Sequence, residues 1–269
     1  MNTSSFKLSF EFLDKRPKEA WLALPINDNS QKIKGIQFSK RPSNVVKSKL
    51  YSYTYYKDLS SDINFSFILK TRIYSSYKDN SDISKYLKDN DWVQLELTKN
   101  IAEKLKTPKN VFNWVITNIS FPKDLSRYLK DLNAIEKVED ILKNKEAECT
   151  GKSLLFVSLC RNINIPARMV HGYFAEQGNI NLRHAQVGKD SLQLHTWAEF
   201  YNKGKWIPVD CQLSQDTKNI YFGYMHEPRI VISKDMNFKL LNNSEIIQIW
   251  QIGETNPKSI NTRIILSKL

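Results

Sequence analysis

Three side chains in the second half of the chain have the chemistry of a nucleophilic catalyst: Cys149, His195 and Asp210. A thiolate can attack a carbonyl carbon, an imidazole can take the thiol proton, and a carboxylate can fix the tautomer of that imidazole. Such a triad works only if the three side chains meet in space. Whether they meet depends on the helix and the strands that carry them.

Cys149 begins a segment that the sequence predicts to be a buried helix. Apolar residues lie nearly all round this helix, which is typical of a helix with no solvent-facing side. The N–H groups and positive dipole at a helix start favour a thiolate and can hold an oxyanion. A lone cysteine is more often a packing residue, so Cys149 needs support from other side chains. The apolar set is Leu154, Leu155, Phe156, Val157, Leu159, Cys160 and Ile163.

His195 and Asp210 lie on two predicted strands of one hairpin. The segments HTWAEFY and KWIPVD flank the polar turn Asn202-Lys203-Gly204. A tight hairpin around this turn pairs residues whose numbers add up to about 405 to 407. We therefore expect His195 and Asp210 to be opposite each other or one position off, with Cβ atoms about 5 Å apart. At that distance the carboxylate can accept the imidazole N–H.

Three motifs carry a family resemblance: ECTGKSLLFVSLCRNINIPARMVHGY, then HTWAEFYNKGKWIPVD, then YFGYMHEPRIVIS. Together they resemble the transglutaminase-like family of bacterial papain-fold cysteine enzymes, over about residues 90 to 240. The resemblance implies that Cys149 is the nucleophile, His195 the base and Asp210 the residue that orients the base. It also implies an α+β fold, a papain-like core in which a central helix packs on an antiparallel sheet.

The chain departs from the family pattern at two places. Ala147 stands two residues before the cysteine, where the family often has glycine, and Asn164-Ile165 precedes the proline where glycine is usual. Asn164 can adopt the left-handed conformation that ends a helix. We therefore expect the fold to tolerate both changes.

The first 80 residues predict a separate all-β region. Residues 6–12 and 63–73 alternate apolar and polar side chains with the two-residue period of a half-buried strand. After residue 90 the period becomes helical, with helices expected from about residue 93 to 105, from Thr107-Pro108 to residue 119, and over residues 134–142. We expect a β-sandwich-like domain over residues 1–80 and a catalytic domain over residues 81–269.

Other reactive or aromatic side chains are given structural roles. We expect Trp197 and Trp206 to pack in the core, and Cys160 to be buried on the helix. Cys211 should point to the strand face opposite that of Asp210. A metal site made from Cys149, His195 and Asp210 is chemically possible, but the triad explains the same residues, so we expect neither a metal nor a cofactor. The three remaining histidines, His171, His184 and His226, show no partner pattern.

Composition narrows the class of protein. The net charge is +12, yet the lysines are spread among acidic residues without a dense basic run, which argues against nucleic acid as a partner. No stretch has the roughly 18 apolar residues of a membrane span, and the N-terminus has no signal-peptide core. We therefore expect a cytoplasmic protein that acts away from membranes. Three cysteines cannot pair completely, so at least one thiol is free.

The expected reaction begins with attack on the amide carbonyl of a protein or peptide substrate, such as a glutamine side chain, and forms a thioester. The resemblance is to a bacterial family in which cross-linking is not the rule, so we expect water to complete the reaction. Two alternatives stay open: transfer to an amine, as in a transglutaminase or an amide-forming acyltransferase, and a non-catalytic binding module on the same fold. The substrate and the oligomeric state are not predicted.

Overall fold

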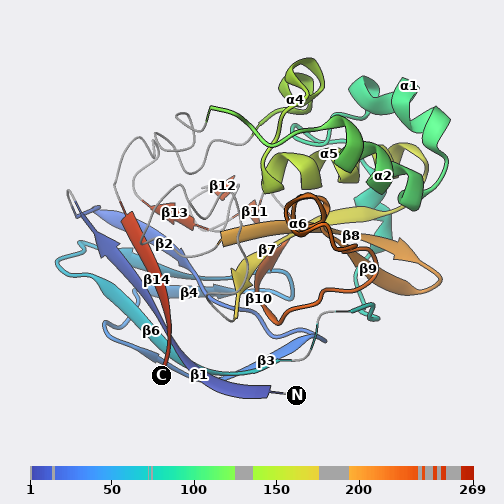
Figure 1. Cartoon of the computed structure of the whole chain (residues 1–269). Helices are drawn as coiled ribbons and strands as arrows, with labels where there is room; N and C mark the ends of the chain where they lie inside the picture. Colours follow the sequence, from blue (N-terminus) through green and yellow to red (C-terminus); the bar gives the residue numbers. More distant parts are fainter. Residues whose placement is uncertain are drawn as a thin grey trace.

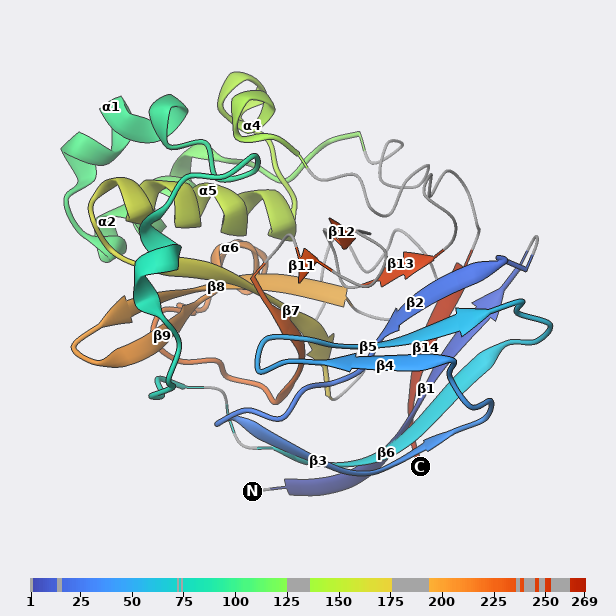
Figure 2. The same cartoon turned by 180° about the vertical axis from the view of Figure 1, so that it is seen from behind.

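The structure is a computed structural model of the 269-residue chain. It describes residues 2–13, 16–71, 73, 75–124, 136–175, 194–235, 238–239, 245–246, 250–252 and 262–269. Helices gather on one side of the molecule and a β-sandwich on the other, with a further antiparallel sheet between them (Figures 1 and 2).

The sandwich consists of two four-stranded antiparallel sheets. The first has the order β14-β1-β6-β3, with β1 Asn2–Phe12, β3 Gln31–Phe38, β6 Ile63–Thr71 and β14 Thr262–Lys268. The second has the order β13-β2-β5-β4, with β2 Glu19–Ala23, β4 Asn44–Lys47, β5 Ser52–Lys57 and β13 Trp250–Ile252. Both sheets contribute to one apolar core, in which alternate residues of β1 and β6 are buried.

Two strands of this sandwich come from the end of the chain. β14 pairs with β1 and β13 pairs with β2. A boundary at residue 80 therefore does not separate the sandwich from the rest of the chain. The sequence did not indicate these pairings because strand pairing between distant segments leaves no local pattern.

The central sheet has the order β10-β7-β8-β9 and is antiparallel throughout. Its strands are β7 Ala167–Phe174, β8 Leu194–Asn202, β9 Lys205–Val209 and β10 Arg229–Lys234. Helix α5, Cys149–Asn162, packs on β7 and β8 and is buried along almost its whole length, as its apolar sequence predicts. A central helix on an antiparallel sheet is the predicted α+β core.

The other helices pack around α5. They are α1 Leu95–Leu105, α2 Pro108–Asn118, α4 Val138–Asn144 and α6 Cys211–Thr217, with a 3-10 helix, η1, at Ile83–Leu87. A two-stranded sheet joins β11 Phe238–Lys239 and β12 Glu245–Ile246. Among the described residues, no helix combines the length and the apolar character needed to cross a bilayer.

Helix ends follow the local sequence signals closely. The Thr107 hydroxyl accepts a hydrogen bond from the Asn110 N–H at 3.2 Å, so the predicted cap at Thr107-Pro108 is confirmed. Asn164 has φ 61°, the left-handed conformation expected after α5. Helix α4 begins at Val138, later than the predicted residue 134; residues 134 and 135 lie outside the described part of the chain.

The place of β14 in the sandwich can be tested by shortening one buried side chain. Leu266 is 3% exposed in the sandwich core, whereas its neighbour Ser267 is exposed on the other face of the strand. We expect Leu266→Ala to lower the free energy of unfolding by about 2–5 kcal/mol, measured by urea denaturation. Ser267→Ala, the matched control, should change it by less than about 0.5 kcal/mol. Equal, small effects would show that β14 is not part of the core.

Candidate active site

His195 and Asp210 form a short hydrogen bond in the interior of the protein. The distance between His195 Nε2 and Asp210 Oδ2 is 2.6 Å, and each side chain is 1% exposed. The other carboxylate oxygen, Asp210 Oδ1, accepts the Leu213 N–H at 2.9 Å and so caps helix α6. One carboxylate therefore joins strand β8 to the start of α6 and holds the imidazole by Nε2.

The approach of His195 to Asp210 is diagonal. In the β8–β9 hairpin Ala198 pairs with Val209, and β9 ends there. The predicted register range is correct, but the expectation that His195 and Asp210 are opposite or one position off is wrong, because they are offset by two positions. Asp210 has left the strand to cap α6, and this change of direction aims its carboxylate back at His195.

Arg229 is a further member of this cluster. Its Nη1 lies 2.8 Å from Asp210 Oδ2, the same oxygen that His195 contacts, and Nη2 lies 2.6 Å from Glu227 Oε1. The guanidinium also lies over the rings of Phe174 and Trp197, at 5.1 and 4.8 Å from their centroids. Arg229 is within the third motif of the sequence, but no spacing rule connects it to Asp210.

The charges around Asp210 keep its carboxylate ionised. Burial alone would raise the pKa of Asp210, but the nearby His195 and Arg229 outweigh burial and hold that pKa well below its usual range. The ionic partner in turn raises the pKa of Arg229 against the opposing effect of burial. Asp210 is therefore a fixed negative charge beside the imidazole.

Cys149 is the first residue of α5, as predicted, and is 5% exposed. The start of α5 packs against strand β8 next to His195: Thr150 Oγ1 lies 3.2 Å from Thr196 Oγ1, and Ser153 donates to the Thr196 carbonyl at 3.2 Å. Because Thr196 directly follows His195, these contacts bring the cysteine end of α5 to the strand that carries the histidine. The grouping of Cys149 with His195 and Asp210 into one triad stays a prediction.

Glu148, the residue before the cysteine, places a negative charge beside the Cys149 thiol. Glu148 Oε1 accepts the N–H groups of Thr150 and Gly151 at 2.9 and 3.2 Å, and Glu148 Oε2 accepts the Cys149 thiol at 2.9 Å. Burial first, and then the charge and hydrogen bond of Glu148, raise the pKa of Cys149 well above its usual value, although a hydrogen bond from the Thr196 backbone acts in the opposite direction. The expected lowering by the helix start is therefore outweighed.

The rings beside His195 form an apolar wall. The Phe174 ring stacks on the imidazole at 5.1 Å between centroids, and the Trp197 ring at 6.4 Å. Trp197 and Trp206 are both fully buried, as predicted. Trp206 belongs to a different cluster, because its Nε1 donates to Asp79 at 2.8 Å.

The remaining cysteines and histidines lie outside this arrangement. Cys160 is buried in the core around α5, as predicted, and Cys211 is buried in the same core after the chain has turned into α6. His171 is buried with Nδ1 3.0 Å from the Thr196 hydroxyl, and burial lowers its pKa to about 4. His226 is exposed, and His184 falls outside the described residues. In the described part of the chain, no three His, Cys, Asp or Glu side chains are grouped to hold a metal ion.

Comparison with known proteins finds a family likeness over the segment that carries Cys149, His195 and Asp210. Residues 91–211 match the model of the transglutaminase-like superfamily. The core of this chain is transglutaminase-like. The matched segment contains the cysteine, the histidine and the aspartate described above, and it ends before Arg229.

The chain also resembles two individual proteins. An uncharacterized protein of Haemophilus influenzae is 25% identical over an alignment of 234 positions. The alignment covers 71% of this chain and 62% of that protein, which is less than two thirds of the relative. A solved structure from Cytophaga hutchinsonii, described as a candidate cysteine protease, matches 100% of this chain and 92% of its own, with a TM-score of 0.65 and 15% identity. At that identity the likeness shows the shared fold.

Removing the charge of Arg229 should destabilise the transglutaminase-like core. Arg229→Gln leaves the buried Asp210 without one of its cations, and breaking a buried ion pair costs about 3–5 kcal/mol. The matched control is Arg263→Gln, whose pair with Glu11 is 3.5 Å long and lies at the surface, and which should cost less than about 1 kcal/mol. Urea denaturation measures both. Equal losses for the two variants would show that Arg229 does not support Asp210.

Neutralising Glu148 should make the Cys149 thiol more reactive. Glu148→Gln removes the carboxylate that raises the pKa of Cys149, so a larger fraction of the thiol is ionised at any neutral pH. We expect alkylation by iodoacetamide at pH 7 to accelerate at least about threefold, with the midpoint of its pH dependence moved to lower pH. Glu139→Gln, an exposed change on α4, serves as the control and should leave the rate unchanged. A slower reaction in Glu148→Gln would contradict the assignment.

Proposed function

We propose that this protein is a cysteine hydrolase of amide bonds in which Cys149 is the nucleophile, His195 the general base and Asp210 the residue that orients the base. The observation that carries the proposal is the 2.6 Å contact of the buried Asp210 with His195 on the strand against which the Cys149 end of α5 packs. A hydrogen-bonded imidazole with its carboxylate is the arrangement that activates a thiol in this chemistry.

The first half of the reaction transfers the acyl group to the cysteine. Asp210 holds His195 by Nε2, so the thiol proton passes to Nδ1 as the sulfur attacks the amide carbonyl carbon. The C–S bond forms and the carbonyl oxygen becomes an oxyanion. When the tetrahedral intermediate collapses, the C–N bond breaks, and the leaving amine takes the proton from His195. The product on the enzyme is a thioester.

The second half returns the enzyme to its starting state. His195 takes a proton from water, the resulting hydroxide attacks the thioester carbonyl, and the C–S bond breaks to give a carboxylic acid and the Cys149 thiol. Hydrolysis of this kind makes the protein a peptidase, an amidase or a deamidase. We propose a protein or peptide as the substrate, without a nucleic-acid partner, a membrane or a cofactor, and a cytoplasmic location.

Glu148 has a defined place in this proposal. The raised pKa of Cys149 means that the thiol is protonated at rest, and the Glu148 carboxylate accepts its hydrogen. A substrate carbonyl must displace that carboxylate to reach the sulfur. Displacement also releases the N–H groups of Thr150 and Gly151, which Glu148 accepts at rest, and these donors can then stabilise the oxyanion.

Acyl-enzyme trapping tests the nucleophile. After incubation of the full chain with a glutamine-containing peptide library and an acid quench, we expect mass spectrometry to find an acyl adduct on Cys149. The adduct should be lost in Cys149→Ala and kept in Cys160→Ala, a control that removes another buried cysteine. An adduct on Cys160, or none on any cysteine, would refute the proposed nucleophile.

A competition between water and an amine identifies the acceptor. The same reaction in ¹⁸O-labelled water with a primary diamine present should give a product that carries ¹⁸O. A product that carries the diamine would instead favour amide transfer. If the wild type releases no product of either kind from the same library, a non-catalytic role for the fold would be favoured.

A further inference from the structure

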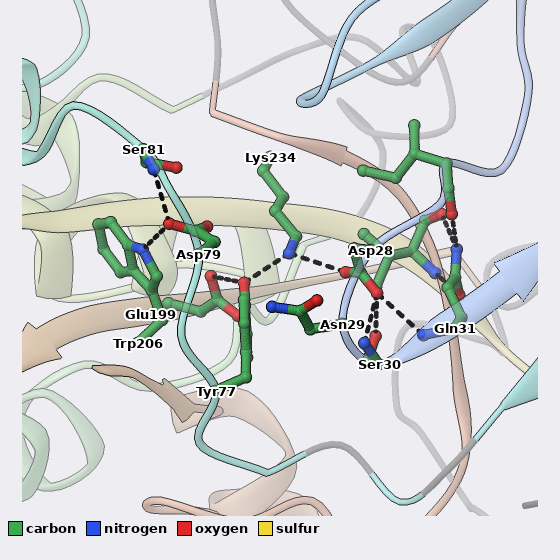
Figure 3. Close-up of polar contacts among 12 residues, drawn as sticks. Asp28, Asn29, Ser30, Gln31, Tyr77, Asp79, Ser81, Glu199, Trp206 and Lys234 are labelled. Carbon is green, nitrogen blue, oxygen red and sulfur yellow. Dashed lines mark hydrogen bonds and ion pairs between the residues drawn. The ribbon is translucent and has the colours of Figure 1, made fainter. Parts of the chain in front are cut away.

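A cavity of about 660 Å³ lies apart from Cys149, between the sandwich and the segment that leads to α1. Its walls come from the loops that follow β2 and β4, from residues 77–82, from η1, and from Lys234 at the end of β10. This volume is within the range of pockets that bind small molecules or short chain segments. Figure 3 shows the polar contacts of several lining residues, among them Asp28, Tyr77, Asp79 and Lys234.

The base of the cavity is a buried ionic network. Lys234, 3% exposed, places its Nζ 2.7 Å from Asp28 Oδ2 and also donates to the Tyr77 hydroxyl (Figure 3). The Tyr77 hydroxyl in turn donates to Glu199 Oε2 at 2.8 Å. A buried cation held by two fixed partners is a rigid feature of the wall, because moving it would separate opposite charges in the interior.

The three carboxylates that line the cavity are occupied by the protein itself. Asp28 is paired with Lys234, and Asp79 lies 2.8 Å from Arg168 Nη2 and accepts the Trp206 N–H at 2.8 Å. Asp82 caps η1 by accepting the Ser84 N–H at 3.0 Å. Two of the three negative charges, those of Asp28 and Asp79, are therefore balanced by cations of the same chain.

Three lysines at the cavity are not balanced in this way. Lys32, Lys49 and Lys78 line it from three separate segments, and each is exposed. Among the described residues, no carboxylate lies within ion-pair distance of any of the three. The lining as a whole carries five lysines and three aspartates, which leaves an excess of two positive charges.

Aromatic side chains supply the apolar part of the lining. Tyr51, Tyr77 and Tyr86 line the cavity, and Tyr77 and Tyr86 are 4% and 0% exposed. The Tyr51 ring, which is partly exposed, offers surface to the carbon atoms of a ligand, while the lysines attract its charges. A ligand that uses both features carries several negative charges on a carbon skeleton.

We infer that this cavity binds a ligand with several carboxylates, either an acidic peptide segment or a free polycarboxylate. The site is distinct from the proposed triad. Glu199, at the base of the network, and His195 are on the same face of β8, four residues or about 13 Å apart, and the buried Trp197 lies between them on that face.

Binding of labelled hexaglutamate to the full chain tests the inference. The charge-loss variant carries Lys32→Gln, Lys49→Gln and Lys78→Gln, which are surface changes that should leave the fold intact. We expect fluorescence anisotropy to show binding that weakens at least about tenfold in this variant, the effect of losing three exposed ion pairs. Raising the salt concentration should weaken binding to the wild type and affect the variant less.

Matched controls decide between specific binding and general attraction. A variant with Lys99→Gln, Lys104→Gln and Lys143→Gln loses the same charge from exposed positions on α1 and α4 and should bind hexaglutamate as the wild type does. Hexaglutamine should not bind. If citrate displaces hexaglutamate at a concentration comparable to that of the peptide, the ligand is a free polycarboxylate. If citrate does not displace hexaglutamate, the ligand is an acidic peptide.

Two results would overturn the inference: no binding of either hexaglutamate or citrate to the wild type, or equal weakening by the two triple variants. Measuring binding also with Cys149→Ala keeps the test independent of catalysis. If Cys149→Ala loses enzymatic activity but binds hexaglutamate as the wild type does, the result bears on the proposed triad and leaves the inferred binding site unaffected.

Discussion

One buried carboxylate, that of Asp210, joins the parts of the candidate active site. Its Oδ2 contacts both His195 and Arg229, and its Oδ1 caps α6. A carboxylate in the interior is strongly unfavourable without such partners, so the strand of the histidine, the strand of the arginine and the start of α6 must keep their relative positions. The orientation of His195 thus follows from the way the core surrounds the Asp210 carboxylate with hydrogen-bonding and charged partners.

The environment of Cys149 illustrates how a full charge outweighs a dipole. The start of a helix is equivalent to roughly half a positive charge, whereas Glu148 places a whole carboxylate 2.9 Å from the sulfur and also occupies two of the helix N–H groups. Burial and this carboxylate together raise the pKa of the Cys149 thiol, so the thiol is neutral at rest. In the proposed mechanism, the activation of this thiol comes from the base on β8 and not from the helix that carries the cysteine.

Local sequence patterns predicted the helix and strands of the site, but they did not predict the contacts between distant segments. The apolar residues of α5 and the Thr107 cap follow directly from neighbouring residues, and the hairpin turn limited the register of β8 and β9 to a narrow range. The diagonal placement of Asp210 depended on where β9 stops, which the turn does not specify. Arg229 was not assigned a role because its partner is brought near only by the pairing of β10 with β7.

The pairing of β1 with β14 has a consequence for folding during translation. Phe6 is opposite Lys268 and Phe12 is opposite Thr262, so β1 leaves the ribosome long before its edge partner β14. The segments of the central helix and its sheet emerge earlier and can pack before the sandwich closes. Until then one edge of β1 stays unpaired in the nascent chain, and such an edge can pair with other chains.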